Sequence, residues 1–128
     1  MIRTFLLSLA FATPALANGD TLSQYLWTAR PLVVFAPSEQ DPRFVQQMAW
    51  LEARRAEFDE RDVVILTDTD PEAQSELRDA LHPRDFQIVL IGKDGQVKLR
   101  KPFPWDAREL SRAIDKMPLR QQEIRSGS

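Results

Sequence analysis

The sequence contains no cysteine, one histidine and four glycines among its 128 residues. Without a thiol, the chain can form no disulfide, and thiol–disulfide exchange and thiol-dependent peroxidase activity are excluded. A zinc site is not expected, because His82 is the sole histidine and zinc sites are built from several His and Cys ligands. The few glycines form no phosphate-binding loop, and no Ser-His-Asp arrangement is present. We therefore expect no cofactor and no metal.

The sequence also lacks an excess of charge of either sign. It has 17 basic and 19 acidic residues and a formal net charge of −2. Such mild acidity argues against electrostatically driven binding to nucleic acid or to a membrane surface. We expect no nucleic-acid partner.

Residues 1–17 have the pattern of a cleaved signal peptide. A short basic start at Met1–Arg3 precedes an apolar run at Phe5–Ala12, and Ala15-Leu16-Ala17 has the small-residue pattern of a cleavage site. The run is shorter than the ~20 residues that a membrane-spanning helix needs, although an uncleaved anchor is the alternative. No later apolar segment is long enough, so we expect export to the periplasm or outside the cell, without stable membrane insertion after cleavage.

The remainder has the length of one domain, which we place at residues 18–118, followed by a polar, basic tail at 119–128. The hydrophobic pattern predicts a helical lead-in, four strands and three helices. The strands are expected at Leu32–Ala36, Val63–Leu66, Phe86–Ile91 and Gln96–Arg100, and the helices from Asp41-Pro42 to near Glu60, at Pro71–Leu81 and at Asp106–Met117.

This order fixes an α/β fold class. A helical crossover joins the first two strands, which should therefore be parallel. The turn sequence Asp94-Gly95 joins the last two, which should be antiparallel. The simplest solution is a mixed four-stranded sheet with helices on both faces, in the order β-α-β-α-β-β-α.

That order, with the closing amphipathic helix, is similar to the thioredoxin fold over Leu32–Met117. Three strings, at Val33–Arg43, Val89–Arg100 and Asp115–Glu123, resemble the domain-of-unknown-function family 4174. The resemblance implies a peroxiredoxin-like, thioredoxin-like domain of bacterial exported and some animal extracellular proteins. It implies no particular activity, because the family has none settled.

The thioredoxin pattern would place its two cysteines near Glu39 and Pro42, and a proline near Gln87, before the third strand. None of these is present. Both parts of a disulfide-exchange site are therefore missing from the chain.

Polar residues nevertheless follow the first two strands, at the sheet edge where open α/β sheets bind ligands. They are Ser38, Glu39, Arg43, Asp68 and Asp70. This edge is a candidate ligand site. The alternative is that Asp41 and Asp70 cap helices and that the other residues are solvated.

Arg43 is predicted in the first turn of a helix, where the helix dipole disfavours a cation. It could pair with Glu39, help the helix N-terminus to hold an anion, or form an ordinary surface salt bridge. The pair Asp68 and Asp70 offers too few ligands for a calcium site. Nor does it come with a third partner that would suggest acid–base catalysis.

A second candidate surface consists of Trp27, Trp105 and Arg120. The two tryptophans are predicted at element boundaries, and Arg120 lies in the predicted tail, which could dock on the body or on a partner. Exposed aromatic side chains are frequent anchors of protein interfaces. The alternative is that the stiff segment Lys101–Trp105 folds back onto the sheet.

These observations favour an exported, non-catalytic binding or interaction module that lacks redox cysteines. Its partner would be an unknown protein or a small anionic ligand. The alternative is a cysteine-independent enzyme, or an anion- or small-ligand-binding protein, that uses Glu39, Arg43, Asp68 and Asp70. A third hypothesis is an oligomerising or scaffold role through the edge strand and Trp105.

Overall fold

The computed structural model describes residues 20–127, so the predicted signal peptide at 1–17 lies outside the described part. The helices are α1 (Asp20–Ser23), α2 (Pro42–Ala53), α3 (Arg55–Glu60), the 3₁₀ turn η3 (Pro71–Ala73), α4 (Glu76–Leu81), α5 (Ala107–Asp115) and α6 (Pro118–Arg125). The strands are β1 (Arg30–Phe35), β2 (Val63–Asp68), β3 (Gln87–Ile91) and β4 (Val97–Lys101). No helix within residues 20–127 has the length and apolar character needed to cross a membrane.

The four strands form one mixed sheet in the order β2-β1-β3-β4. β1 is parallel to β2 and antiparallel to β3, and β3 is antiparallel to β4. The predicted pairing directions are therefore confirmed. At the hairpin, Gly95 has φ +85°, a left-handed conformation that glycine adopts without the cost of a Cβ atom.

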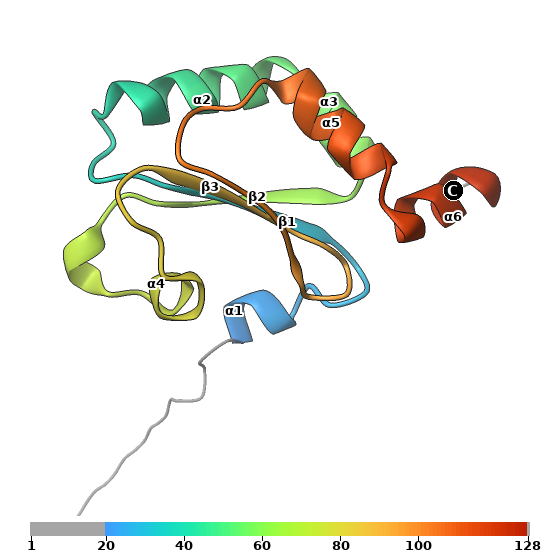
Figure 1. Cartoon of the computed structure of the whole chain (residues 1–128), viewed down its shortest axis with the longest axis horizontal. Coiled ribbons are helices and arrows are strands. Elements are labelled where there is room, and N and C mark those ends of the chain that lie inside the picture. Colours follow the sequence, from blue (N-terminus) through green and yellow to red (C-terminus); the bar gives the residue numbers. More distant parts are fainter. Residues whose placement is uncertain (1–19, 128) are drawn as a thin grey trace, which may run out of the picture.

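Helices cover both faces of the sheet, as predicted (Figure 1). α2, α3 and α5 lie on one face, α1 and α4 lie on the other, and α6 lies at one end. β1 is central, so all six of its residues are buried. Because side chains alternate along a strand, Leu32 and Val34 pack toward α2 and α5, whereas Val33 and Phe35 join the core beneath α4.

Two predicted helices are each interrupted once. The helix expected from residue 42 to near residue 60 breaks at Arg54, whose φ of −126° and ψ of 31° are not helical. In the segment predicted as one helix from Pro71 to Leu81, Gln74 adopts a left-handed φ of 50°, and Ser75 then caps α4. The hydrophobic pattern is periodic across both breaks and does not reveal them.

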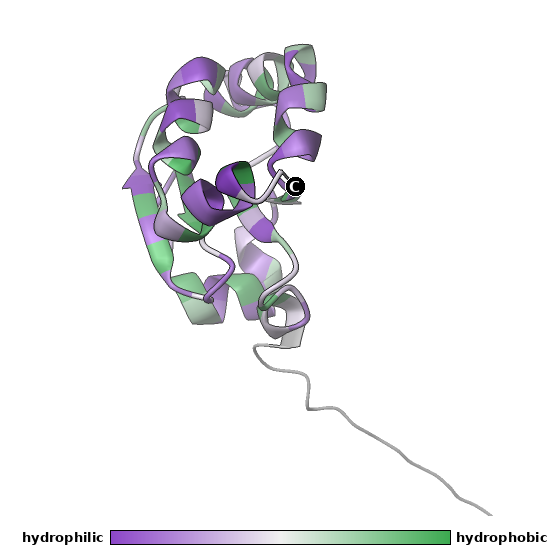
Figure 2. Ribbon diagram, turned by 90° about the vertical axis from the view of Figure 1, so that its right-hand side faces the viewer, coloured by the Kyte–Doolittle hydropathy of each residue, from purple (hydrophilic) through white to green (hydrophobic). Residues whose placement is uncertain are grey.

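The segment predicted as a polar tail is helical. Pro118 stands at the first position of α6, where its fixed φ and missing N–H are tolerated. Figure 2 shows α6 coloured mainly hydrophilic, which matches the scarcity of apolar residues in its sequence. The helix therefore has little hydrophobic surface with which to pack on the sheet.

Candidate functional site

The ends of three strands meet at the predicted ligand-binding edge, which we call the carboxyl edge. Phe35, the last residue of β1, pairs with Asp68 of β2 and with Gln87 of β3. The Ala36 N–H donates to the Asp68 carbonyl at 3.1 Å, which extends this pairing by one residue. The loops after β1 and β2 are therefore neighbours, as predicted, and the start of β3 joins them.

Arg43 is held at this edge by two aspartates. Its Nε and Nη2 lie 2.9 and 2.7 Å from the two carboxylate oxygens of Asp41, and its Nη1 lies 3.0 Å from Asp85 Oδ2. The guanidinium also lies 5.5 Å from the ring centre of Phe86. The hydrogen bond from Arg43 lowers the pKa of Asp41 to about 2, and the bonds to both aspartates raise the pKa of Arg43. The pairing that the sequence suggested, with Glu39, is replaced by these two.

A second arginine bridges the ends of β1 and β2. Arg78 of α4 donates from Nε to Asp68 Oδ1 at 2.9 Å and from Nη2 to the carbonyls of Ala36 and Asp68 at 3.2 and 3.1 Å. The guanidinium lies 5.2 Å from the ring centre of Phe35. The Asp68 side chain is 8% exposed, so this ion pair is largely withdrawn from water.

Asp68 is also a hydrogen-bond acceptor for Ser75, the residue that caps α4. Burial would raise the pKa of Asp68, but the hydrogen bonds from Ser75 and Arg78 outweigh it and lower the pKa. Asp68 is thus an ionised structural anchor that ties α4 to the end of β2.

The remaining predicted residues of the carboxyl edge, Ser38, Glu39 and Asp70, take part in fewer polar contacts. The Ser38 carbonyl accepts the Asp41 N–H at 3.3 Å. Glu39 and Asp70 are exposed, and their side chains make no hydrogen bond or ion pair within residues 20–127. Asp41 caps α2 as expected, because its side chain accepts the Arg43 N–H, whereas Asp70 precedes η3 without a capping bond.

Sequence reasoning missed Asp85 and Arg78. Asp85 lies just before β3, and the antiparallel pairing of β3 with β1 brings it to the carboxyl edge. The predicted topology contained that signal. Arg78 could not be assigned in the same way, because its position depends on the break at Gln74. Within the described residues, no three His, Asp or Glu side chains converge to hold a metal ion.

Trp27 lies at the opposite end of the strands, in the turn that leads into β1. Its side chain is 65% exposed, and its φ of 66° is left-handed. The Trp27 N–H donates to the Lys93 carbonyl at 2.7 Å. Beside the indole is an open pocket of about 640 Å³. Its lining consists of Trp27, Lys93, Leu119, Gln122, Glu123, Arg125 and Ser126.

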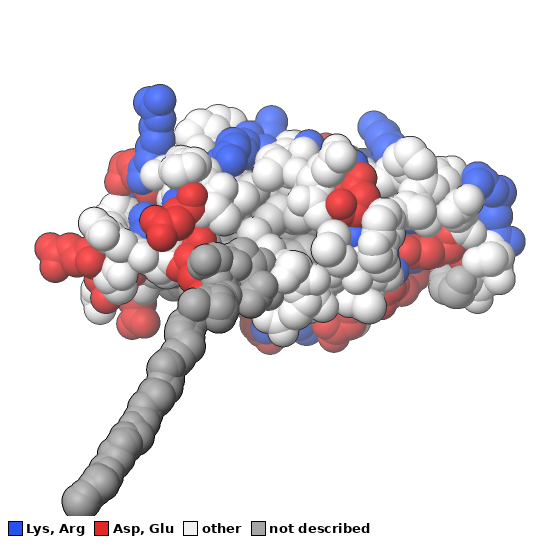
Figure 3. Space-filling model, turned by 90° about the horizontal axis from the view of Figure 1, so that it is seen from below, with Lys and Arg blue, Asp and Glu red and all other residues white. Residues whose placement is uncertain are grey.

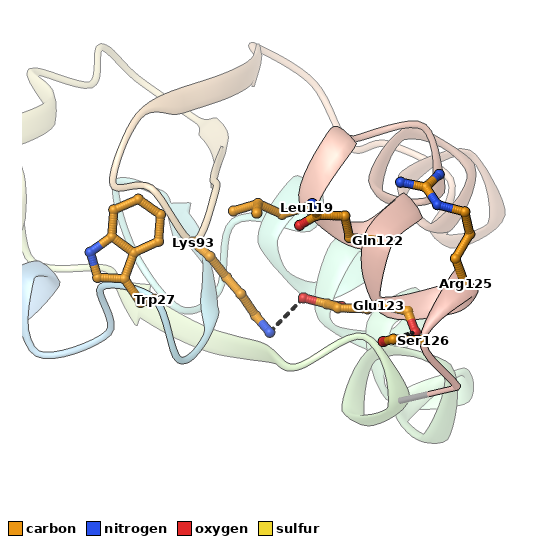
Figure 4. A pocket seen from close by; sticks show the side chains of 7 residues that line it. All are labelled: Trp27, Lys93, Leu119, Gln122, Glu123, Arg125 and Ser126. Carbon is orange, nitrogen blue, oxygen red and sulfur yellow. Dashed lines mark hydrogen bonds and ion pairs between the residues drawn. The ribbon is translucent and has the colours of Figure 1, made fainter.

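Figure 4 shows how this pocket is built: Trp27 stands on one side, and α6 forms the other. Lys93 reaches across to Glu123, with 2.7 Å between Lys93 Nζ and Glu123 Oε2. We call this space, with its seven lining residues, the Trp27 pocket.

Trp105 and Arg120 do not belong to an exposed surface with Trp27. The Trp105 ring is partly buried against the core and lies 4.7 Å from Lys101 Nζ, so this part of the segment folds back onto the body. Arg120 is 5% exposed and pairs with Asp115 and Glu123. Of the two possibilities that the sequence left open for this tail, the structure shows docking on the body, because the helix beyond Pro118 turns the Arg120 side chain inward.

Residues 21–123 match the family described as Domain of unknown function (DUF4174). The chain belongs to this family. It is also 26% identical, over 133 residues, to Coiled-coil domain-containing protein 80 of Danio rerio. That match covers 80% of this chain and 15% of the zebrafish protein, so the chain spans a small part of its relative.

Among solved structures, the chain is similar to the reduced 2-Cys peroxiredoxin of Plasmodium vivax, with a TM-score of 0.63 and 17% identity over 82% of this chain and 90% of that one. It is also similar to thioredoxin peroxidase I of Plasmodium yoelii, with a TM-score of 0.60 and 19% identity over 87% of each chain. These likenesses show a thioredoxin-like fold.

In this DUF4174 domain the thioredoxin-like scaffold carries no thiol. At the carboxyl edge it carries two arginines, each stacked on a phenylalanine and each bonded to aspartate. The edge of this thioredoxin-like scaffold therefore carries a set of ion pairs and no thiol.

Proposed function

We propose that this chain is an exported, non-catalytic binding module built on a thioredoxin-like scaffold. The observation that carries the proposal is that both stacked arginines at the carboxyl edge are held in ion pairs. Arg43 is bonded to Asp41 and Asp85, and Arg78 is bonded to Asp68. A substrate approaching either guanidinium would therefore compete with a carboxylate that is already bonded to it.

Two carboxylates at this edge, those of Asp41 and Asp68, are poorly suited to acid–base catalysis. An effective general acid or base has a pKa near the working pH. The pKa values of Asp41 and Asp68 are lowered instead, the former to about 2. Both groups are ionised at neutral pH and have little affinity for a proton, so these two carboxylates suit a structural role better than an enzymatic one.

The charge balance also disfavours a small anion as the ligand. The guanidiniums of Arg43, Arg78 and Arg100, the last bonded to Gln87, share the edge with the five carboxylates of Glu39, Asp41, Asp68, Asp70 and Asp85. An anion approaching Arg43 would compete with two bonded aspartates and meet a negative field. Figure 3, seen from the side of α1 and α4, shows acidic and basic side chains interspersed on that face. A protein partner fits these charges better than a small anion.

A thermal-shift panel of phosphate, other anions, metals and small metabolites tests the proposal against its alternative. A ligand at about 100 times its Kd adds ~2.7 kcal/mol to the free energy of unfolding. Each kcal/mol raises the midpoint of a domain this size by about 4–8 °C. We expect no shift that depends on Arg43.

The matched variants are Arg43→Ala and Arg112→Ala, the latter at an exposed pair with Glu109. A shift that disappears in Arg43→Ala and persists in Arg112→Ala would favour the anion-binding or enzymatic alternative. Saturable binding of a peptide selected from a random library, with the peptide recovered intact, would support the binding module.

Export is tested separately. The supporting pattern is the basic start, apolar run and small-residue site in residues 1–17. When the full sequence is expressed in a bacterial host, the protein should appear in the periplasm or medium. Its mass should be that of a chain that begins at Asn18. Retention of the full mass in the cytoplasm would contradict export without bearing on the binding role.

A further inference from the structure

We propose that the Trp27 pocket binds a protein segment that presents an apolar side chain beside a carboxylate. This inference rests on the proposed binding function and gives it a location and a partner chemistry. Three observations carry it: the backbone conformation of Trp27, the fixed wall opposite the indole, and the charges that line the pocket.

Folding alone does not account for tryptophan at position 27. A residue with φ of 66° occupies a region that favours glycine and is uncommon for large side chains. Burial of the indole does little to offset this backbone strain, because 65% of the residue's surface is exposed. Strained backbone at a bulky residue often marks a functional site. A tryptophan kept exposed in such a conformation suits the role of an interface anchor.

The strain at Trp27 is held in place by its neighbours. Its N–H donates to the Lys93 carbonyl at 2.7 Å. The N–H groups of Thr28 and Ala29 both donate to the Tyr25 carbonyl at 3.0 Å. The indole is therefore presented from a fixed turn, which reduces the ordering that binding would otherwise require.

The α6 wall of the pocket is fixed as well. Glu123 pairs with Arg30 and Lys93, and Arg120 pairs with Asp115. Arg30 and Arg120 are 1% and 5% exposed, so the guanidiniums of these pairs lie beneath the surface. The pocket is thus formed before a partner arrives.

The lining specifies the chemistry of the partner. Lys93 and Glu123 neutralise one another in the pocket. The Arg125 side chain, by contrast, makes no hydrogen bond or ion pair with any residue in the described part of the chain. Trp27 and Leu119 supply apolar surface. An uncommitted guanidinium beside apolar surface complements an aliphatic or aromatic side chain next to Asp or Glu.

A random twelve-residue peptide library displayed on phage, selected on the full chain, provides the test. We expect enriched peptides that pair Asp or Glu with a large apolar residue. A synthetic peptide of the consensus should bind with an affinity reduced at least about tenfold by Trp27→Gly. Arg125→Ala should reduce it by roughly three- to tenfold, as expected for one charged contact.

Two variants serve as matched controls. Phe103→Ala removes another aromatic side chain, which is 52% exposed. Arg108→Ala removes another exposed arginine. Both should change the affinity less than about twofold. Circular dichroism and thermal midpoints of all four variants show that each is folded.

The outcomes separate the site from the function. A basic consensus, or a consensus peptide whose affinity is unaffected by Trp27→Gly and Arg125→Ala, overturns the site and leaves the binding function standing. Failure to enrich any peptide on the folded wild-type chain counts against both.

Discussion

Arg30 at the start of β1 and Glu123 in α6 form a two-pronged ion pair across 93 positions of sequence, with Nη1–Oε1 and Nη2–Oε2 distances of 3.3 and 3.1 Å. The guanidinium is 1% exposed and also donates to the Arg61 carbonyl at 2.8 Å. Lys93 approaches the same carboxylate at 2.7 Å. One glutamate therefore joins α6 to β1 and to the β3–β4 hairpin, in a helix that has little apolar surface of its own.

Glu123→Gln should destabilise the domain by about 3 kcal/mol, because removing one member of a buried pair leaves the other charge uncompensated. The thermal midpoint should fall by more than about 10 °C. Urea denaturation followed by circular dichroism measures the change. The control is Glu109→Gln, whose exposed pair with Arg112 should contribute less than ~1 kcal/mol. Equal effects of the two variants would mean that Glu123 does not anchor α6.

The same network predicts how stability depends on acid. Burial would raise the pKa of Glu123, but the bonds from Lys93 and Arg30 lower it from its ordinary value of 4.5. The pKa of Asp115 is lowered from 3.8, because Arg61 and Arg120 outweigh its burial. A carboxylate with a lowered folded pKa adds stability above its unfolded pKa and loses it as the pH falls through the folded one.

The free energy of unfolding should therefore fall steadily between about pH 5 and pH 3. Glu123→Gln should show a shallower decline, because it lacks one of the groups that take up a proton. Urea midpoints measured at half-unit intervals of pH provide the comparison. If the stability of the variant and of the wild type fell in parallel with pH, Glu123 would contribute nothing to the loss of stability in acid.

Much of the scaffold was predictable from local signals. Buried β-branched runs located β1 and β3, the Asp41-Pro42 start located α2, and Asp94-Gly95 located the hairpin. These features depend on neighbouring residues in the sequence, and the pairing directions follow from the lengths of the connections.

The features that were missed depend on distant residues. Whether Arg120 is buried depends on acidic partners from α3 and α5 and on Glu123 in its own helix. The Trp27 pocket is lined by residues from both ends of the described chain, and the sequence gives no sign that residues 27 and 119 face one another across it. At the carboxyl edge, residue types suggested a polar site, but whether those charges were paired required the positions of Arg78 and Asp85.

Two substitutions at Trp27 separate backbone strain from side-chain contacts. Both Trp27→Gly and Trp27→Ala remove the indole, but only glycine adopts the left-handed conformation without strain. The glycine variant should therefore be more stable than the alanine variant by about 1 kcal/mol. Thermal unfolding of the two variants, side by side, measures the difference. An alanine variant equal to or more stable than the glycine variant would show that the turn does not hold this residue in a strained conformation.

Gln47 fixes the segment between β4 and α5, and its loss should be costly. Its fully buried amide donates to the Trp105 carbonyl at 3.0 Å and accepts the Trp105 N–H at 2.8 Å. Gln47→Leu keeps most of the volume but leaves both backbone groups without their partner, at about 1–3 kcal/mol for each group that water cannot reach. We expect a loss of about 2–4 kcal/mol in urea denaturation and faster hydrogen exchange at the Trp105 amide.

Gln46→Ala, at the exposed neighbouring position, should change stability by no more than about 0.5 kcal/mol. Unchanged exchange at Trp105 in Gln47→Leu would mean that water replaces the amide and that Gln47 does not hold the segment.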